Sequence, residues 1–126
     1  MEYDPDITPN PQDWLSLDEG ERIALVVRYH KKAGDKLPNV RLHAAVHTAV
    51  ENQIAEDITE VTSAFKRLMK EGLHRHDAIH AVGSVLVKQI YKIGKGEATS
   101  SPNAEYLKDL GSLTASSWLS VNRSGT

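Results

Sequence analysis

The chain has 126 residues, a length typical of one domain whose core is large enough to fold without cross-links. Its 15 lysine and arginine residues nearly balance its 17 aspartate and glutamate residues, so no strong field favours nucleic acid or an anionic membrane. It has no cysteine, which excludes disulfides and thiolate ligands and leaves imidazole, carboxylate and water to hold any metal.

The N-terminal segment MEYDPDITPN is acidic and contains prolines, and it lacks the basic start and apolar core of a signal peptide. No apolar run in the sequence reaches the length of a membrane-spanning helix. We therefore expect a cytoplasmic protein that binds neither nucleic acid nor a membrane. The sequence leaves open whether the chain forms a homo-oligomer or binds another protein.

The organisation expected from the sequence is one helical domain between two tails. Prolines at positions 5, 9 and 11 predict an extended N-terminal tail over residues 1–13, because proline fixes φ and disfavours helix in the preceding residue. Trp14 is expected to dock this tail onto a helical domain of residues 14–119. The last residues, 120–126, are expected to form a flexible C-terminal tail.

Helical periodicity predicts four long helices and a weaker fifth. Ser16 and Glu19 have the spacing of a capping box at the start of the first helix, and Asn39 is the expected N-cap of the second. The expected helices span about residues 17–33, 38–56, 59–71, 74–93 and 104–119. No segment shows the period-two alternation of a strand, so the predicted fold class is all-α, a single compact, bundle-like domain of four to five helices.

The second predicted helix carries two histidines on its apolar face. A rotation of about 100° per residue puts His43 and His47 among the apolar positions, with Glu51 beside them. On the first predicted helix, His30 also lies on the apolar side. These positions predict imidazole groups inside the core rather than on the surface.

The fourth predicted helix repeats this arrangement. His76 and His80 fall among core positions, whereas His74 points to water. Gly83 lies directly below the pair, where the absence of a side chain would let another helix approach closely. The two HxxxH pairs are therefore expected to face each other in the core.

One buried histidine is usually a hydrogen-bonded core residue, but several together are costly unless a metal coordinates their lone pairs. Pairs at i and i+4 present two nitrogens to one ion. We therefore predict a bound transition metal ion, zinc or iron, with Glu51 either as a ligand or as the acceptor that fixes a histidine tautomer. The candidate ligands are His43, His47, His76, His80, Glu51 and His30.

Three enzyme or metal-site patterns share some of these residues. HDAIH has the spacing of the zinc-peptidase motif HExxH, with Asp77 at the general-base position. The order of a histidine, a His-Asp dyad and the later Asp109 resembles HD-domain phosphohydrolases. His30, HxxxE and HxxxH resemble hemerythrin-type di-iron bundles, but no histidine follows His80 to supply the last element. If the protein is hydrolytic, Asp77 or Glu51 is the candidate base, and the sequence does not decide whether it is an enzyme.

A broader resemblance covers most of the chain. LHAAVHTAVENQIA followed by GLHRHDAIHAVGSVLVKQIY resembles a family of small bacterial helical proteins classed as a domain of unknown function. That family has HxxxH in one helix and GLxRHEAxH in the next but one, and Asp77 departs from its more usual glutamate. The resemblance implies no activity, but it implies that the two histidine pairs belong to one unit. The matching positions are His43, His47, Gly72, Leu73, Arg75, His76 and His80.

A protein-interaction module is the competing interpretation. In such a non-enzymatic protein the core histidines would form a hydrogen-bonded network without metal. Arg75, Lys66, Lys70 and Arg67 would then form only a solvated basic face.

Overall fold

The computed structural model describes residues 1–124 of the chain, with side chains described as far as Val121. This part of the chain is all-helical, as the sequence predicts, but it has seven helices instead of four to five. They are α1 (Pro11–Ser16), α2 (Glu19–Ala33), α3 (Val40–Ala55), α4 (Thr59–Lys70), α5 (Arg75–Gly94), α6 (Pro102–Ser112) and α7 (Ala115–Ser124).

The first additional helix, α1, lies partly within the segment expected to be extended. Its N-cap is Asn10, whose side chain accepts a hydrogen bond from the Asp13 amide at 3.1 Å. Pro11 occupies the first helical position, where its missing N–H removes no helical hydrogen bond. The proline that we expected to keep the chain extended therefore starts a helix.

α1 also changes the start of α2. Ser16 is the last residue of α1, so it does not cap α2 with Glu19 as the sequence suggested. The capping box of α2 is instead formed by Asp18 and Glu21, with the Asp18 side chain 2.8 Å from the Glu21 amide. The expected N-cap of α3, Asn39, is confirmed by its hydrogen bond from the Leu42 amide.

The second additional helix arises because the segment expected to be one helix, residues 104–119, is broken near Thr114. The Thr114 side chain accepts from the Ser117 amide at 3.0 Å, and the Ser117 hydroxyl lies 3.2 Å from the Thr114 amide. These contacts begin a new helix, α7, which continues to Ser124. Residues 120–124, expected to belong to a flexible tail, continue this helix, and the last two residues of that tail lie outside the described part.

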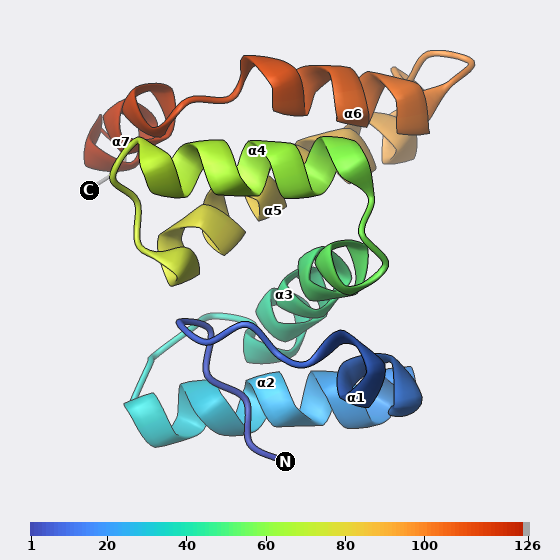
Figure 1. Cartoon of the computed structure of the whole chain (residues 1–126). Coiled ribbons are helices and arrows are strands. Elements are labelled where there is room, and N and C mark those ends of the chain that lie inside the picture. The colour runs from blue at the N-terminus through green and yellow to red at the C-terminus, as the bar shows by residue number, and fades with distance from the viewer. Residues whose placement is uncertain (125–126) are drawn as a thin grey trace.

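The apolar side chains form two clusters. The N-terminal cluster contains Tyr3, Trp14, Leu25, Val26 and Ala44. The C-terminal cluster is larger and includes Val50, Leu68, Ile79, Val82 and Leu110. In Figure 1, α4 and α6 lie beside each other on one side of α3, and α1 and α2 lie on the other side. α3 contributes to both clusters and connects the two halves of the molecule.

α3 and α5 approach each other closely at Gly83. A Cβ atom at this position would lie 2.9 Å from Val46 Cγ1, which is closer than van der Waals contact. The expected role of Gly83 in the approach of another helix is therefore confirmed. None of the described helices is both long and apolar enough to span a membrane.

Candidate metal centre

Five histidine rings come together where α2, α3 and α5 meet. α2 contributes His30, α3 contributes His43 and His47, and α5 contributes His76 and His80. Neighbouring ring centroids in this group are 4.4–5.9 Å apart. The predicted meeting of the two HxxxH pairs is therefore present, and a fifth imidazole joins it from α2.

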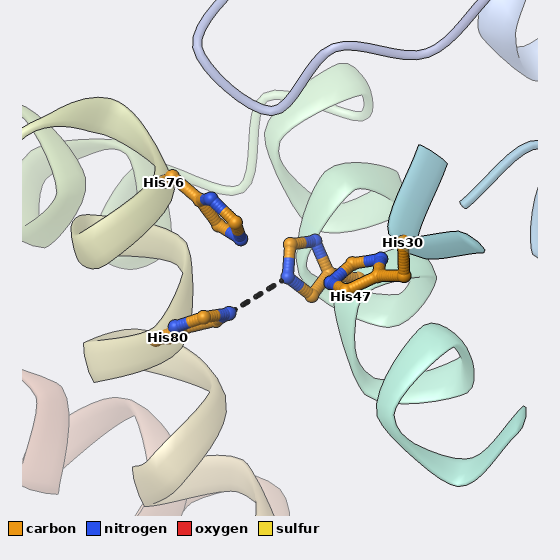
Figure 2. A group of neighbouring side chains, drawn as sticks. All are labelled: His30, His47, His76 and His80. Carbon is orange, nitrogen blue, oxygen red and sulfur yellow. Dashed lines mark hydrogen bonds between the residues drawn. The ribbon is translucent and has the colours of Figure 1, made fainter. Parts of the chain in front are cut away.

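Four of these side chains form a group that could hold one metal ion. His30, His47, His76 and His80 each offer a nitrogen, and the four atoms all lie within 4.8 Å of one another. Figure 2 shows the four rings pointing toward a common region from three helices, with His47 and His80 directly opposed. We call them the four-histidine group.

The tautomer of His30 follows from its backbone contact. Its Nδ1 lies 3.0 Å from the carbonyl oxygen of Val26. Because a carbonyl can only accept, Nδ1 must carry the hydrogen, and the lone pair is on Nε2. His30 is only 1% exposed, and its Nε2 is buried without a hydrogen-bond partner. An uncompensated acceptor is therefore buried within the cluster.

The tautomer of His47 is fixed through a tyrosine of the N-terminal segment. The Tyr3 hydroxyl donates to Glu51 Oε2 at 2.5 Å and lies 3.2 Å from His47 Nδ1. Since the Tyr3 hydrogen is used by Glu51, its oxygen accepts from His47 Nδ1–H. The lone pair of His47 is thus on Nε2, which lies 3.0 Å from His80 Nε2. In the absence of a metal, His80 must donate in this contact.

Glu51 lies beside the four-histidine group but not within it. Its two carboxylate oxygens each accept a hydrogen bond from Arg75 at 2.8 Å, and both side chains are almost completely buried. Glu51 is linked to His47 through the Tyr3 hydroxyl, and its expected role as a ligand or as the acceptor that fixes a histidine tautomer stays a prediction.

Arg75 is not part of a solvated basic face, which corrects the expectation from the sequence. It is 4% exposed, and it also donates to the carbonyl of Pro5 at 2.8 Å and the hydroxyl of Thr8 at 3.1 Å. Its guanidinium lies over the Phe65 ring. Burying a cation is favourable only with such a set of partners, so this side chain fastens the N-terminal segment to α5.

Arg67 is also structural, since it donates to the carbonyls of Leu110 and Leu113 at 2.9 and 2.7 Å. These contacts hold α4 against the end of α6. Of the four basic residues expected on one face, only Lys66 and Lys70 are exposed.

Two further histidines of the cluster also have a ring nitrogen without a hydrogen-bond partner. The Nε2 atoms of His43 and His76 are buried and have no hydrogen-bond partner. The His43 ring lies 4.7 Å from that of His30 and 5.0 Å from that of His80, although His43 is outside the four-histidine group. His43 is therefore a close neighbour of the group.

Burial and mutual proximity keep the imidazoles neutral. Desolvation, followed by the charge repulsion of the other histidines, lowers the pKa of His80 to about 3. The same causes lower the pKa of His47 still further, and those of His43 and His76 are lowered as well. Their lone pairs are thus available for coordination at neutral pH.

Other residues from the sequence-based patterns lie outside the four-histidine group. His74 is exposed at the N-cap of α5, which agrees with its expected outward orientation. Asp77 is half-buried in the first turn of α5, and Asp109 lies on α6. The group of side chains that could hold a metal ion therefore includes neither of the aspartates that the HD-type pattern requires.

Tyr3 is the functional residue that sequence reasoning missed. It is 5% exposed, and its hydroxyl joins Glu51 to His47. Its one signal in the sequence is an aromatic residue in an otherwise polar, proline-rich segment.

Comparison with family models, with curated proteins and with solved structures gave no match to this chain.

Proposed function

We propose that the protein binds one transition metal ion, zinc or iron, through His30, His47, His76 and His80. The observation that carries the proposal is the convergence of these four donors from three helices within 4.8 Å. Zn–N bonds of about 2.0–2.1 Å place tetrahedral ligand atoms about 3.3–3.4 Å apart. The 3.0 Å separation of the His47 and His80 Nε2 atoms is close to that value. This pair would have to separate slightly to admit the ion, and donor atoms of the group that lie up to 4.8 Å apart would have to move closer together.

A metal-free histidine network is the competing function, and the hydrogen bonds argue against it. The direct contact between His47 and His80 satisfies one pair of nitrogens. The Nε2 atoms of His30, His43 and His76 are left buried and unpaired. Each unsatisfied buried group costs about 1–3 kcal/mol. A metal that takes up several of these lone pairs removes much of that cost.

The surroundings of the four-histidine group support a metal site more specifically than burial does. His30 and His47 each use Nδ1–H toward an oxygen, which directs Nε2 to the centre. Metal-binding histidines characteristically have such an acceptor behind them. In this proposal Glu51 is the outer acceptor, acting through Tyr3, and it is not the general base of a hydrolytic site because Arg75 holds both its oxygens.

We also propose that the chain belongs to the family of small bacterial helical proteins that it resembles. The assignment is supported by the distinct structural role that each of several positions of the GLxRHEAxH motif has in this chain. Gly72 has a φ of +111°, Leu73 is buried and Arg75 forms the ion pair with Glu51. His76 and His80 face the centre.

Metal analysis tests the proposed function. Protein purified without a nickel column should contain close to one equivalent of zinc or iron by elemental analysis. Protein stripped with a chelator should melt at a higher temperature after addition of zinc or iron(II). The proposal is overturned if the protein contains no metal and neither ion shifts the melting temperature.

Variants identify the ligands. His76→Gln should abolish stoichiometric metal binding, while the exposed His74→Gln, two residues away, should retain it. Circular dichroism distinguishes loss of metal from loss of the helical fold. Full metal content in a folded His76→Gln protein would exclude His76 as a ligand.

A further inference from the structure

A cavity of about 520 Å³ lies against one side of the four-histidine group. His47 and His80 of that group form part of its wall, together with His43. The other two members, His30 and His76, do not line it. The remainder of the wall is mainly apolar and includes Leu42, Val46, Ile79, Val87 and Trp118.

The size and lining of this cavity are those of a small-molecule site. Ligand pockets commonly enclose about 300–1,000 Å³ and combine an apolar wall with a few polar groups. Here the polar side chains are three imidazoles together with Asn39 and Ser84, and Leu42 and Val87 are 61% and 47% exposed. A bound apolar molecule would cover both of these side chains while its polar end reached the histidines.

The charge of the metal centre determines which polar group the bound molecule should carry. The four-histidine group contains only neutral ligands, and the charge of Glu51 is already paired with Arg75. A divalent ion bound there would keep its charge and attract an anionic oxygen donor. The residues that line the cavity include no lysine, arginine, aspartate or glutamate. The site therefore matches a molecule that has one anionic group, bound at the metal, and is otherwise apolar.

We infer that this cavity binds a small monocarboxylate, whose carboxylate joins the four histidines as a fifth ligand of the metal and whose hydrocarbon part lies between Leu42, Val87 and Trp118. The inference rests on the proposed metal site. His43 lines the cavity, and its Nε2 has no hydrogen-bond partner. In the neutral tautomer that carries its hydrogen on Nε2, His43 would donate a hydrogen bond to the carboxylate oxygen that the metal does not bind.

The test uses full-length protein loaded with zinc, or with cobalt(II) as a spectroscopic substitute. Acetate, butanoate, hexanoate and octanoate are titrated, and octan-1-ol serves as the uncharged probe of the same length as octanoate. Trp118 fluorescence reports binding at the apolar end, and the visible spectrum of cobalt reports coordination. We expect affinity to rise about fourfold per added methylene until the cavity is full. Octanoate should alter the cobalt spectrum, and octan-1-ol should not.

A matched pair of variants locates the apolar part. Val87→Asp places a like charge in the wall and should weaken octanoate binding at least tenfold without changing the metal content. Ile93→Asp is the control, because Ile93 is on the same helix, is 52% exposed and does not line this cavity. Octanoate affinity should be unchanged in that variant. Equal affinities in the two variants would overturn the assigned position.

The outcomes separate this inference from the metal proposal. A protein that binds no metal overturns both. A metal-loaded protein that binds octanoate no more tightly than acetate overturns the inference alone. Equal affinity for octanoate and octan-1-ol with an unchanged cobalt spectrum overturns the metal-bound carboxylate. Concentration-dependent dimerisation that excludes octanoate would show that a second copy of the chain covers the cavity.

Discussion

Glu51 and Arg75 form a two-point ion pair between α3 and α5, with both N–O distances at 2.8 Å. These two helices carry four of the five clustered histidines. The paired charges are almost fully buried, so neither residue has water as an alternative partner. The pair therefore fixes the relative position of the two HxxxH segments while taking no place in the four-histidine group.

Replacement of Glu51 by glutamine should strongly destabilise the protein. It leaves the Arg75 charge buried without an opposing charge, and such a change costs about 3–5 kcal/mol. The free energy of unfolding in urea measures the effect. Lys32→Gln is the control, because it breaks the exposed pair with Glu2 and should change stability by less than about 1 kcal/mol. Similar losses in the two variants would show that the buried pair has no special role.

Tyr3→Phe should weaken metal binding about 10–100-fold, the usual effect of removing an outer hydrogen-bond partner. The ring remains to fill the core, but His47 loses the oxygen beside its Nδ1. Competition with a chromophoric chelator measures the affinity.

Tyr106→Phe provides the matched control for Tyr3→Phe. Tyr106 is also buried, and its hydroxyl donates to Gln53 at 2.7 Å in the C-terminal cluster. Tyr106→Phe should lose about 0.5–1.5 kcal/mol of stability, and Tyr3→Phe about 1.5–3 kcal/mol, because the Tyr3 hydroxyl donates to the Glu51 carboxylate. Only Tyr3→Phe should lose metal affinity, and an equal decrease in both would assign the effect to general destabilisation.

Gly83→Ala should destabilise the protein by about 1–3 kcal/mol, the usual cost of overpacking a core. The added methyl group would lie 2.9 Å from Val46 Cγ1 and push α3 away from α5. Gly94→Ala, on the same helix and with open space around it, should instead be neutral or stabilising by up to about 1 kcal/mol. Thermal and urea unfolding measure the stability of both variants. A second substitution, Val46→Ala, should restore part of the stability lost in Gly83→Ala.

The metal-free protein should lose stability as the pH falls below about 6.5. Histidines of the unfolded chain take up protons near that pH, while the pKa of His80 in the folded state is lowered to about 3 by burial and by its histidine neighbours. The unfolded state then binds more protons, so stability decreases by at most about 1.4 kcal/mol per pH unit for each such histidine. Urea unfolding between pH 7.5 and 5 measures the slope. His80→Gln should give a shallower slope, and an unchanged slope would contradict this origin.

The sequence predicts the helical class and the four long helices because their apolar periodicity is strong. It does not predict α1 or the break between α6 and α7, which depend on local capping by Asn10 and Thr114. Pro11 is compatible with an extended chain and with a helix start alike. The cap formed by Asn10 and the contacts of Trp14 in the N-terminal cluster together favour the helix.

The candidate site was predictable where it depends on helix rotation. The inward positions of His47, His76 and His80 follow from the 3.6-residue period. The choice between His30 and His43 as the fourth donor does not, because it depends on how α2 approaches α3. The partners of Arg75 also depend on tertiary structure, since Thr8 and Pro5 lie far from it in the sequence.

The contacts of Arg75 with the N-terminal segment also constrain the order of folding. They join residues that are 67 and 70 positions apart, and Tyr3 and Glu51 are 48 apart. Because a loop must close before such distant residues can meet, we expect these contacts to form after the local helices. We therefore expect the hydroxyl that orients His47 to reach its place after the contacts between α3 and α5, which join residues only 24 and 33 positions apart. A metal ion would then enter a nearly finished protein and would not act as the nucleus around which the chain folds.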